Sequence, residues 1–399
     1  MLYTVINFVG IIAFLGLAYL LSKNRRQIKW RTVINLLILD VVLAAFMNLV
    51  PLGRHLVQAA ASGFTEFINI AYVGIGFALP NWVNAPQMNF ITAALLPLLM
   101  VVPFFDILTY FGILPLIIRY IGKALAFVAR TPKFESFYAI EMMFLGNNDA
   151  LAVSRLQIQN MHMTRNLTLA MMSMSCVSAS LIGAYCQMMP AEFVLAAIPL
   201  NVVNALIVTN ILFPVEIKPE DDVIYGLDEN KEKPPFFSYL SDSIMGAGRL
   251  IFIITCSVIA FVALAALINA FLGLFHASLS LENILGCIMF PFAWLLGLSP
   301  GEAFTLAQYM GKKLITNEFV VMLDAKELLN TFSPHMQAVL TMFVTSFANF
   351  GTVGIIIGTF KGLLPDDKVS IISRNVVYMM LSGIMVSLLT AALGGLFVW

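Results

Sequence analysis

The sequence predicts an all-α polytopic membrane protein with eight transmembrane helices, two re-entrant helical hairpins in an inverted repeat, and interfacial amphipathic helices. Of its 399 residues, 60% are hydrophobic and only 11% are charged, whereas soluble domains carry about 25% charged residues. The mean hydropathy is +0.91. Two short polar segments interrupt the apolar sequence, and each precedes a broken apolar helix, which indicates a repeated architecture.

Eight apolar stretches are long enough to cross a bilayer, which takes about 20 mostly apolar residues. They cover residues 2–21, 33–52, 90–109, 167–188, 192–213, 250–271, 338–360 and 376–398. Residues 113–130 instead combine basic side chains with an apolar stripe, which is typical of an interfacial helix. Residues 281–298 are apolar with few charges and could form either a span or a helix packed along the interface.

The two polar segments are residues 146–149 (Gly-Asn-Asn-Asp) and 316–319 (Thr-Asn-Glu-Phe). They lie within residues 134–159 and 300–332, which are too polar at their centres for simple spans and therefore suit re-entrant hairpins. An acid at membrane depth costs about 2.5–3.5 kcal/mol, so it is retained where it faces a cavity or a partner. Because each segment is followed by a broken helix, the sequence predicts a two-fold repeated binding site inside the bilayer.

Charge distribution predicts the orientation of these elements. The densest basic cluster, at residues 23–31, is expected on the cytoplasmic side, which places the amino terminus outside. The first hairpin then enters from the cytoplasm and the second from outside, as an inverted repeat requires. The only long hydrophilic segment, residues 215–242, is acidic and is interpreted as a solvated linker between the two halves.

Each polar feature also has a simpler interpretation. Residues 146–149 suit a connecting loop rich in turn-favouring Asn and Asp, and Glu318 could be an exposed loop acid. The segment 347–352 (Phe-Ala-Asn-Phe-Gly-Thr) could be a motif for close helix packing. Asp40, in the middle of a span, could bond to a neighbouring helix, and Asn201 and Asn204 could either pack or line the site.

Several functional classes find no support in the sequence. No nucleophile motif, zinc-protease motif, phosphate-binding loop or dinucleotide fingerprint occurs in a usable context, so we expect neither an enzyme nor a bound cofactor. The four cysteines lie in apolar stretches without metal-like spacing, which predicts no metal site. No basic patch or RNA-reading signature points to nucleic acid.

The order of the motifs resembles the concentrative nucleoside transporter family, in its bacterial NupC-type branch. The matching segments run from the first basic loop to the last span. They are Gly-Ile-Leu-Pro at 112–115, Glu-Ser-Phe-Tyr-Ala at 135–139, Leu-Gly-Asn-Asn-Asp at 145–149, Ile-Gly-Ala-Tyr at 182–185, Thr-Asn-Glu-Phe-Val at 316–320 and Ser-Phe-Ala-Asn-Phe at 346–350.

This resemblance implies a homotrimer in the bacterial plasma (inner) membrane, with a rigid scaffold and a mobile transport domain in each subunit. Residues 1–111 would form scaffold spans 1–3, and 112–214 the interfacial helix, first hairpin and first half of the transport domain. Residues 215–248 would be the linker, and 249–399 a scaffold span, the second hairpin and the second half of the transport domain.

The resemblance also implies a nucleoside site enclosed by the hairpins and broken helices. Glu318 and Asn349 would hold the ribose hydroxyls, with Thr352 at a position where the family often has serine, and Phe347 would flank the base. The remaining implied contacts are an apolar one from Leu181 and, facing the base, Asn147, Asn148 and Asp149.

Two departures from the family pattern bear on specificity and coupling. The first hairpin tip is usually Gly-Gln-Thr/Ser-Glu, so the shorter Asn147 and Asp149 leave more room and favour a purine nucleoside. Sodium-coupled members carry an asparagine and a hydroxyl where this chain has Met142 and Cys176, and sulfur is a poor ligand for a hard cation. Asp149 and Glu318 become candidate proton carriers, because a carboxylate removed from water can take up a proton near neutral pH.

The sequence therefore predicts a proton-coupled nucleoside symporter that works by alternating access, with a hairpin tip that favours purine nucleosides. A symporter for a nucleobase or another small polar solute is the first alternative, and it would not need Glu318 and Asn349. A membrane receptor that kept the fold without transport is the second.

Overall fold

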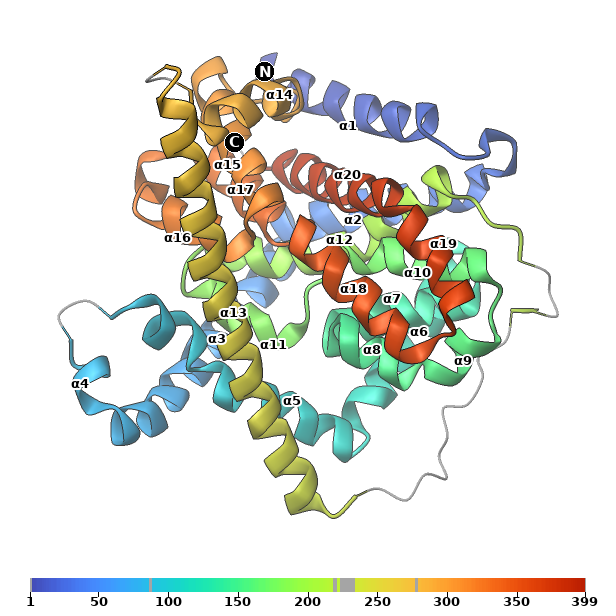
Figure 1. Cartoon of the computed structure of the whole chain (residues 1–399). Helices are drawn as coiled ribbons and strands as arrows, with labels where there is room; N and C mark the ends of the chain where they lie inside the picture. The colour runs from blue at the N-terminus through green and yellow to red at the C-terminus, as the bar shows by residue number, and fades with distance from the viewer. Residues whose placement is uncertain (1, 86–87, 218–220, 223–233, 277–278, 399) are drawn as a thin grey trace.

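The computed structural model describes residues 2–85, 88–217, 221–222, 234–276 and 279–398, and within these ranges all regular structure is helical (Figure 1). Six helices are long and apolar enough to cross a membrane. They are α1 (Leu2–Leu20), α2 (Trp30–Asn48), Ile91–Tyr110, which joins a π-helical turn to α5 (Leu98–Tyr110), α12 (Ala191–Leu212), α13 (Phe236–Gly273) and α20 (Val376–Gly395).

The other two predicted spans are each broken into two shorter helices. The first consists of α10 (Met163–Ser173) and α11 (Ala179–Cys186), and the second of α17 (Pro334–Val344) and α18 (Phe350–Leu363). We name the irregular segments 174–178 and 345–349 the first and second helix breaks. Non-helical backbone at membrane depth requires internal hydrogen-bond partners, so each break must be satisfied by neighbouring side chains.

Two hairpins turn at the polar segments that the sequence singled out. The first joins α7 (Lys133–Leu145) to α8 (Asn147–Val153), and α9 (Arg155–Asn160) follows it. Gly146 turns the chain with φ = 84°, and a Cβ there would lie 2.8 Å from the Ser178 Cβ, so glycine alone fits. The second hairpin joins α15 (Pro300–Ile315) to α16 (Glu318–Lys326).

Short helices outside the spans complete the structure. In α6 (Ile113–Ala129) the buried residues Leu114, Ile118, Leu125 and Ala129 fall on one face, in agreement with an amphipathic helix. Helix α14 (Leu281–Trp294) has 14 residues. It is therefore about 21 Å long and shorter than the roughly 30 Å hydrocarbon core. It packs along α15, and α19 (Asp366–Arg374) joins α18 to α20.

Two features differ from the sequence expectation. Helix α3 (Pro51–Ala78), followed by α4 (Pro80–Val83), was not predicted, because Arg54, His55 and Glu66 interrupt its apolar sequence. Helix α13 has 38 residues and begins at Phe236, inside the segment expected to be linker. Of that linker, residues 218–220 and 223–233 lie outside the described part of the chain.

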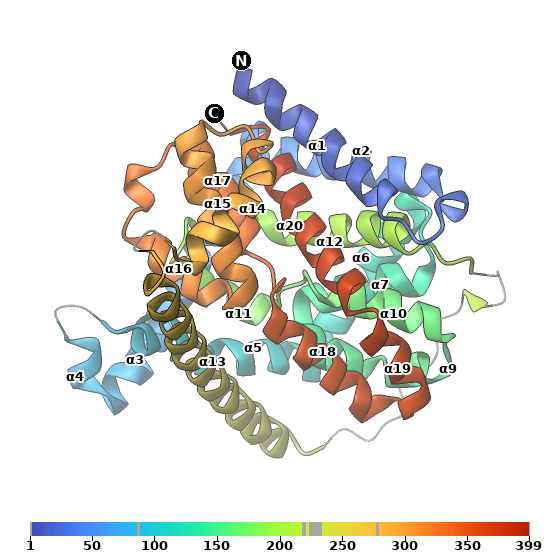
Figure 2. The same cartoon turned by 45° about the horizontal axis from the view of Figure 1, so that its top comes forward.

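The buried core of the molecule is built on α12 and α20. In each, 72% of the most apolar window is buried, compared with 17% for α13. Helices α1 and α2 pack on α12 and α20, whereas α13 packs on α5. Figures 1 and 2 both show α13 along the side of the bundle opposite α9 and α19. The helix breaks and hairpin tips thus lie between a buried core and a peripheral long helix.

Candidate functional site

A cavity of about 460 Å³ lies where the two hairpin tips meet the two broken helices, with α5 and α13 forming its remaining wall. This volume falls in the usual range for small-molecule sites. Seven of the eight predicted site residues line it, namely Asn147, Asp149, Leu181, Glu318, Phe347, Asn349 and Thr352. The side chain of the eighth, Asn148, lies outside the described residues. The structure therefore brings residues from both halves of the chain to one cavity.

Glu318 is the polar centre of this cavity. Its side chain is only 3% exposed, and its two oxygens accept different hydrogen bonds. Tyr185 of α11 donates its hydroxyl to Oε1 at 3.1 Å, and Asn349 donates Nδ2 to Oε2 at 3.1 Å. A carboxylate has about four acceptor positions. Glu318 therefore keeps acceptor capacity for a ligand while the protein fixes its orientation.

Asn349 connects the second helix break to Glu318. Its Oδ1 accepts hydrogen bonds from the Thr352 backbone N at 2.8 Å and the Thr352 Oγ1 at 3.1 Å. This is an N-cap, which satisfies amides at the start of α18 that have no partner within the helix. Asn349 therefore places its Nδ2 toward Glu318 because α18 holds the opposite end of the same amide.

The first hairpin presents a different kind of surface. Asn147 donates Nδ2 to the Ser173 carbonyl at 2.7 Å, at the end of α10. Its Oδ1 is buried, and in the described part of the chain no donor reaches it. Asp149 is exposed at the cavity, and Leu181 is 3% exposed beside it. On this wall, Asp149 is the polar group that a ligand could engage, whereas the Asn147 oxygen is buried.

Aromatic rings close the end of the cavity near Glu318. Phe319 packs against Tyr185 with ring centroids 5.2 Å apart, and Phe90 lies 6.0 Å from Phe319. Phe347 is half-buried and lines the same space. Flat apolar walls of this kind suit a planar ring system.

Lys313 is a buried residue that the sequence analysis did not single out. It is 0% exposed, and its Nζ donates to the Phe343 carbonyl at 2.6 Å and to Ser346 Oγ at 2.5 Å. Nζ also lies 4.6 Å from the centroid of the Phe343 ring. A cation here satisfies carbonyls at the end of α17 and complements the negative end of its dipole.

A sequence signal for Lys313 did exist. The buried residues of α15 include Ala303, Leu306 and Met310, and Lys313 follows in the same i, i+3, i+4 stripe. Tyr185 was likewise visible as a hydroxyl in an apolar broken helix. Asp106 of α5 and Ser243 of α13 are hydrogen-bonded to each other and line the cavity. Asp106 had a signal as an acid inside the predicted span 90–109, whereas Ser243 had none.

Sulfur-containing side chains stand at the two positions where the sequence departs from the pattern of sodium-coupled members. Met142 is 0% exposed and Cys176 is 1% exposed. Ser173 Oγ lies 3.4 Å from the Met142 sulfur and donates to the Leu169 carbonyl at 2.9 Å. Among the described residues, no group of three or more His, Cys, Asp or Glu residues could hold a metal ion.

Helix α20 passes between the two helix breaks. A Cβ on Gly383 would lie 2.8 Å from the Ala348 Cβ and 3.1 Å from the Met174 Cβ. Ala348 belongs to the second break and Met174 to the first, so a larger residue at this point would push on both. The absence of a side chain lets α20 support the two breaks together.

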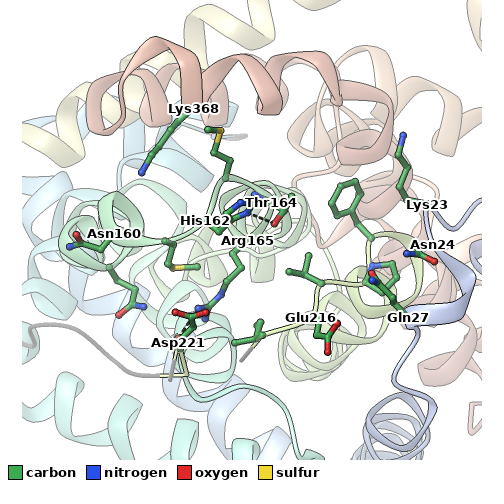
Figure 3. A pocket seen from close by; sticks show the side chains of 17 residues that line it. Lys23, Asn24, Gln27, Asn160, His162, Thr164, Arg165, Glu216, Asp221 and Lys368 are labelled. Carbon is green, nitrogen blue, oxygen red and sulfur yellow. Dashed lines mark hydrogen bonds between the residues drawn. The ribbon is translucent and has the colours of Figure 1, made fainter. Parts of the chain in front are cut away.

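A second cavity, of about 860 Å³, contains none of the predicted site residues. Figure 3 shows its lining, which includes Lys23, His162, Glu216 and Lys368. Arg165 at its wall is bound by Glu135 in a two-point contact of 2.8 and 2.9 Å and donates to the Asp221 carbonyl. Its charges are mixed in sign and partly paired within the protein, so we do not assign the solute site here.

Comparison with known families agrees with this arrangement. The family described as "Na+ dependent nucleoside transporter C-terminus" matches residues 193–395, and its N-terminal counterpart matches residues 9–82. The chain belongs to the concentrative nucleoside transporter family. Its fold class and the NupC-type resemblance predicted from the motifs are thereby confirmed.

Individual relatives extend over the whole chain. The purine nucleoside transport protein NupG of Bacillus subtilis is 45% identical over 398 residues, which is 100% of both chains. The nucleoside permease NupC of Helicobacter pylori is 26% identical and covers 98% of this chain and 97% of its own. These relatives are transport proteins and permeases, not enzymes.

Solved structures show the same fold. CNTnw in an inward-facing, substrate-bound state matches with a TM-score of 0.92 at 24% identity, covering 99% of this chain and 98% of that one. An outward-facing state of a CNTnw variant matches with a TM-score of 0.93 over the same shares. The eight spans, two hairpins and helix breaks are therefore the fold of this family.

Proposed function

We propose that this protein is a proton-coupled nucleoside symporter that imports purine nucleosides by alternating access. The observation that carries the proposal is the buried Glu318 carboxylate, held by Asn349 and Tyr185 at the edge of an enclosed cavity. Two free acceptor positions on Glu318 and the second N–H of Asn349 suit the vicinal hydroxyls of a ribose. Transport of nucleosides by the relatives supports this reading.

A purine preference is favoured by two independent observations. Asn147 and Asp149 are shorter than the residues usual at this hairpin tip, so the base has more room. The exposed carboxylate of Asp149 is an acceptor, which suits the N–H groups of hypoxanthine or guanine. The relative with 45% identity is itself named a purine nucleoside transport protein.

Proton coupling is favoured by the sulfur atoms of Met142 and Cys176, which replace the oxygen ligands of sodium-coupled members. Hard cations prefer oxygen, and Met142 is enclosed by Ser173 and Tyr138, which are hydrogen-bonded to each other at 3.0 Å. Asp149 and Glu318 are the proposed proton carriers, because both carboxylates border the cavity through which the solute passes.

The proposal includes the assembly and the orientation. Residues 1–111 would supply scaffold spans, and residues 215–248 would be the linker. Residues 112–214 and 249–399 would form the two halves of the transport domain together with the remaining scaffold span. The homotrimer is supported by the apolar residues that α3 and α13 leave exposed, including Val73, Phe77 and Phe252. The protein would lie in the bacterial inner membrane with its amino terminus outside.

Radiolabelled uptake into proteoliposomes tests this proposal. Inosine, guanosine and uridine are offered under separately imposed proton and sodium gradients. Asn160→Ala is the control substitution, because Asn160 lies outside the cavity. We expect accumulation of inosine or guanosine above uridine that follows the proton gradient. Accumulation that requires sodium would overturn the coupling. Uptake of free bases that survives Glu318→Gln would favour the nucleobase alternative, and saturable binding without accumulation would favour the receptor.

A further inference from the structure

Asp40 is a buried acid outside the cavity. It lies in the middle of α2, on the same stripe as Val33, Leu36 and Ala44. Its side chain is 0% exposed, and among the described residues no donor is in hydrogen-bonding position at either carboxyl oxygen. A buried carboxylate without a partner is disfavoured, whereas a neutral acid is tolerated. The state of this group therefore depends on what surrounds it.

Within the described part of the chain, no charged group is paired with Asp40. The neighbouring polar side chain is Asn204 of α12. The ionisable residues on the helices packed against α2 are Arg54, His55, Glu66 and Tyr72 on α3, Arg119, Tyr120 and Lys123 on α6, Glu192 on α12 and Tyr378 on α20. None of them forms an ion pair or hydrogen bond with the Asp40 carboxyl among the described residues. The partner of Asp40 is thus a neutral amide.

A chain of hydrogen bonds determines which groups of the Asn204 amide are already paired. The Thr345 carbonyl in the second helix break can only accept, and it receives Nδ2 of Asn201 at 2.5 Å. The Oδ1 of Asn201 then accepts the Thr390 hydroxyl at 2.8 Å. Because the Thr390 hydrogen is committed, its oxygen accepts Nδ2 of Asn204 at 3.2 Å.

One N–H and one oxygen of Asn204 remain at the end of this chain. The Oδ1 is buried and has no donor among the described residues. An ionised Asp40 carboxylate could accept the N–H but would be repelled by Oδ1 of Asn204, since the carboxylate and Oδ1 are both acceptors. A carboxylic acid can instead donate its O–H to that oxygen, which pairs the buried Oδ1 without requiring the Asn204 N–H to reach either carboxyl oxygen.

We propose that Asp40 is a proton-binding site that is occupied in this conformation. As a carboxylic acid it pairs with Asn204 and completes a hydrogen-bond chain from α2, through α12 and α20, to the second helix break. The chain ends four residues before Asn349, so a proton bound outside the cavity supports the segment that carries a site residue. This does not require the proton to travel with the nucleoside.

A bound cation is the competing explanation for unpaired oxygens. A hard cation takes about six or more oxygen ligands, whereas Asp40 and Asn204 together present three. A proton needs only one acceptor beside the acid that carries it. The geometry therefore favours a proton.

Infrared difference spectroscopy on the purified protein tests the proposal directly. With aspartate isotopically labelled at its side-chain carboxyl carbon, we expect a protonated-carboxyl band that shifts in deuterium oxide and is missing in Asp40→Asn. Asn204→Ala should move the band, because it removes the partner of the acid. The absence of such a band from the unsubstituted protein at neutral pH would overturn the proposal. So would a band that appears only when sodium is withdrawn, because the ligand would then be the cation.

Melting temperatures give a second, independent readout. Asp40→Asn presents an N–H and an oxygen to the same amide, so its melting temperature should stay close to that of the parent. Asp40→Leu has similar volume but leaves Asn204 unpaired, and it should melt several degrees lower. Equal losses in both variants would mean that the negative charge itself is needed. No loss in either would mean that the pair does not form, and both results contradict the proposal.

Discussion

The two helix breaks share a topology but differ in how their backbone groups are satisfied. At the second break, Lys313 and Asn201 donate to the Phe343 and Thr345 carbonyls, and Asn349 caps α18. At the first break, the Ser173 carbonyl receives the neutral amide of Asn147. In the described part of the chain, neither α8 nor α11 has a side-chain N-cap.

The comparison teaches that the inverted repeat reproduces the path of the chain but not its chemistry. The second half fixes its polar groups in contacts around Glu318, as the proposed ribose site would require. The first half leaves the Asp149 carboxylate exposed, where our proposal places the base. Variants at matched positions in the two halves can break or sharpen this contrast.

The largest effect is expected from Glu318→Gln, at the centre of the tightly held half. The substitution keeps the volume but weakens two hydrogen bonds to a charged group, each contributing about 1.5 kcal/mol or more. We expect kcat/KM for riboside uptake to fall by roughly 100-fold. The counterpart in the loosely held half, Asp149→Asn, should change the ranking of bases more than the overall rate. Equal losses of kcat/KM in both variants would contradict the proposed difference between the two halves.

Removing the buried cation should mainly lower stability. Lys313→Met keeps the length of the side chain but leaves the Phe343 carbonyl with only the long 3.4 Å hydrogen bond from Ser346 Oγ, at a cost of about 1–3 kcal/mol. Lys312→Met is the control, because Lys312 pairs with the exposed Asp324 near the surface, and such pairs contribute about 0–1 kcal/mol. Thermal unfolding in detergent should separate the two variants. If Lys312→Met were the more damaging, our assignment of Lys313 as the support of the second break would be wrong.

Oxygen ligands introduced at the first break should create a response to sodium. We expect the double variant Met142→Asn, Cys176→Ser to take up nucleoside faster when a sodium gradient is imposed, with a coupling free energy of about 1–3 kcal/mol. The same pair of substitutions leaves the second break untouched, so Glu318 should remain essential. Uptake by the double variant that still ignores sodium would count against the sulfur explanation for proton coupling.

The smallest effect concerns the caps. Asn317 accepts a hydrogen bond from the Val320 N at 3.0 Å and caps α16, so Asn317→Ala should cost about 1 kcal/mol of stability. Ser178 stands at the N-cap position of α11 in the first broken helix but forms no such cap there. Ser178→Ala should therefore be close to neutral. The two melting temperatures, measured in parallel, check this difference.

Much of this fold was predictable because membrane helices must be apolar over a fixed length. The two hairpin tips were also visible, because Asn, Asp and Glu rarely stand inside apolar sequence without a reason. Helix α3 was missed for the converse reason, since Arg54, His55 and Glu66 dilute its apolar sequence.

The partners of the site residues could not be predicted in the same way. Spacing along one helix indicates which residues share a face, but Tyr185 and Glu318 are 133 positions apart and meet only through the packing of the first broken helix against the second hairpin. The chain from Thr345 to Asn204 likewise joins three separate segments, namely the second break, α12 and α20. Such contacts depend on tertiary structure. The residue pattern alone indicates which residues could take part in them, but not which residues meet.

Gly383 has a consequence for the order in which the protein is made. It follows every site residue in the chain, yet it lies against Met174 and Ala348 in the two breaks. The ribosome therefore delivers Glu318 and Asn349 before the helix that holds both breaks in place. The proposed nucleoside pocket would not be complete during synthesis until α20 has entered the bilayer, so a nascent chain stalled before Gly383 should contain every proposed ligand-contacting side chain and still bind no nucleoside.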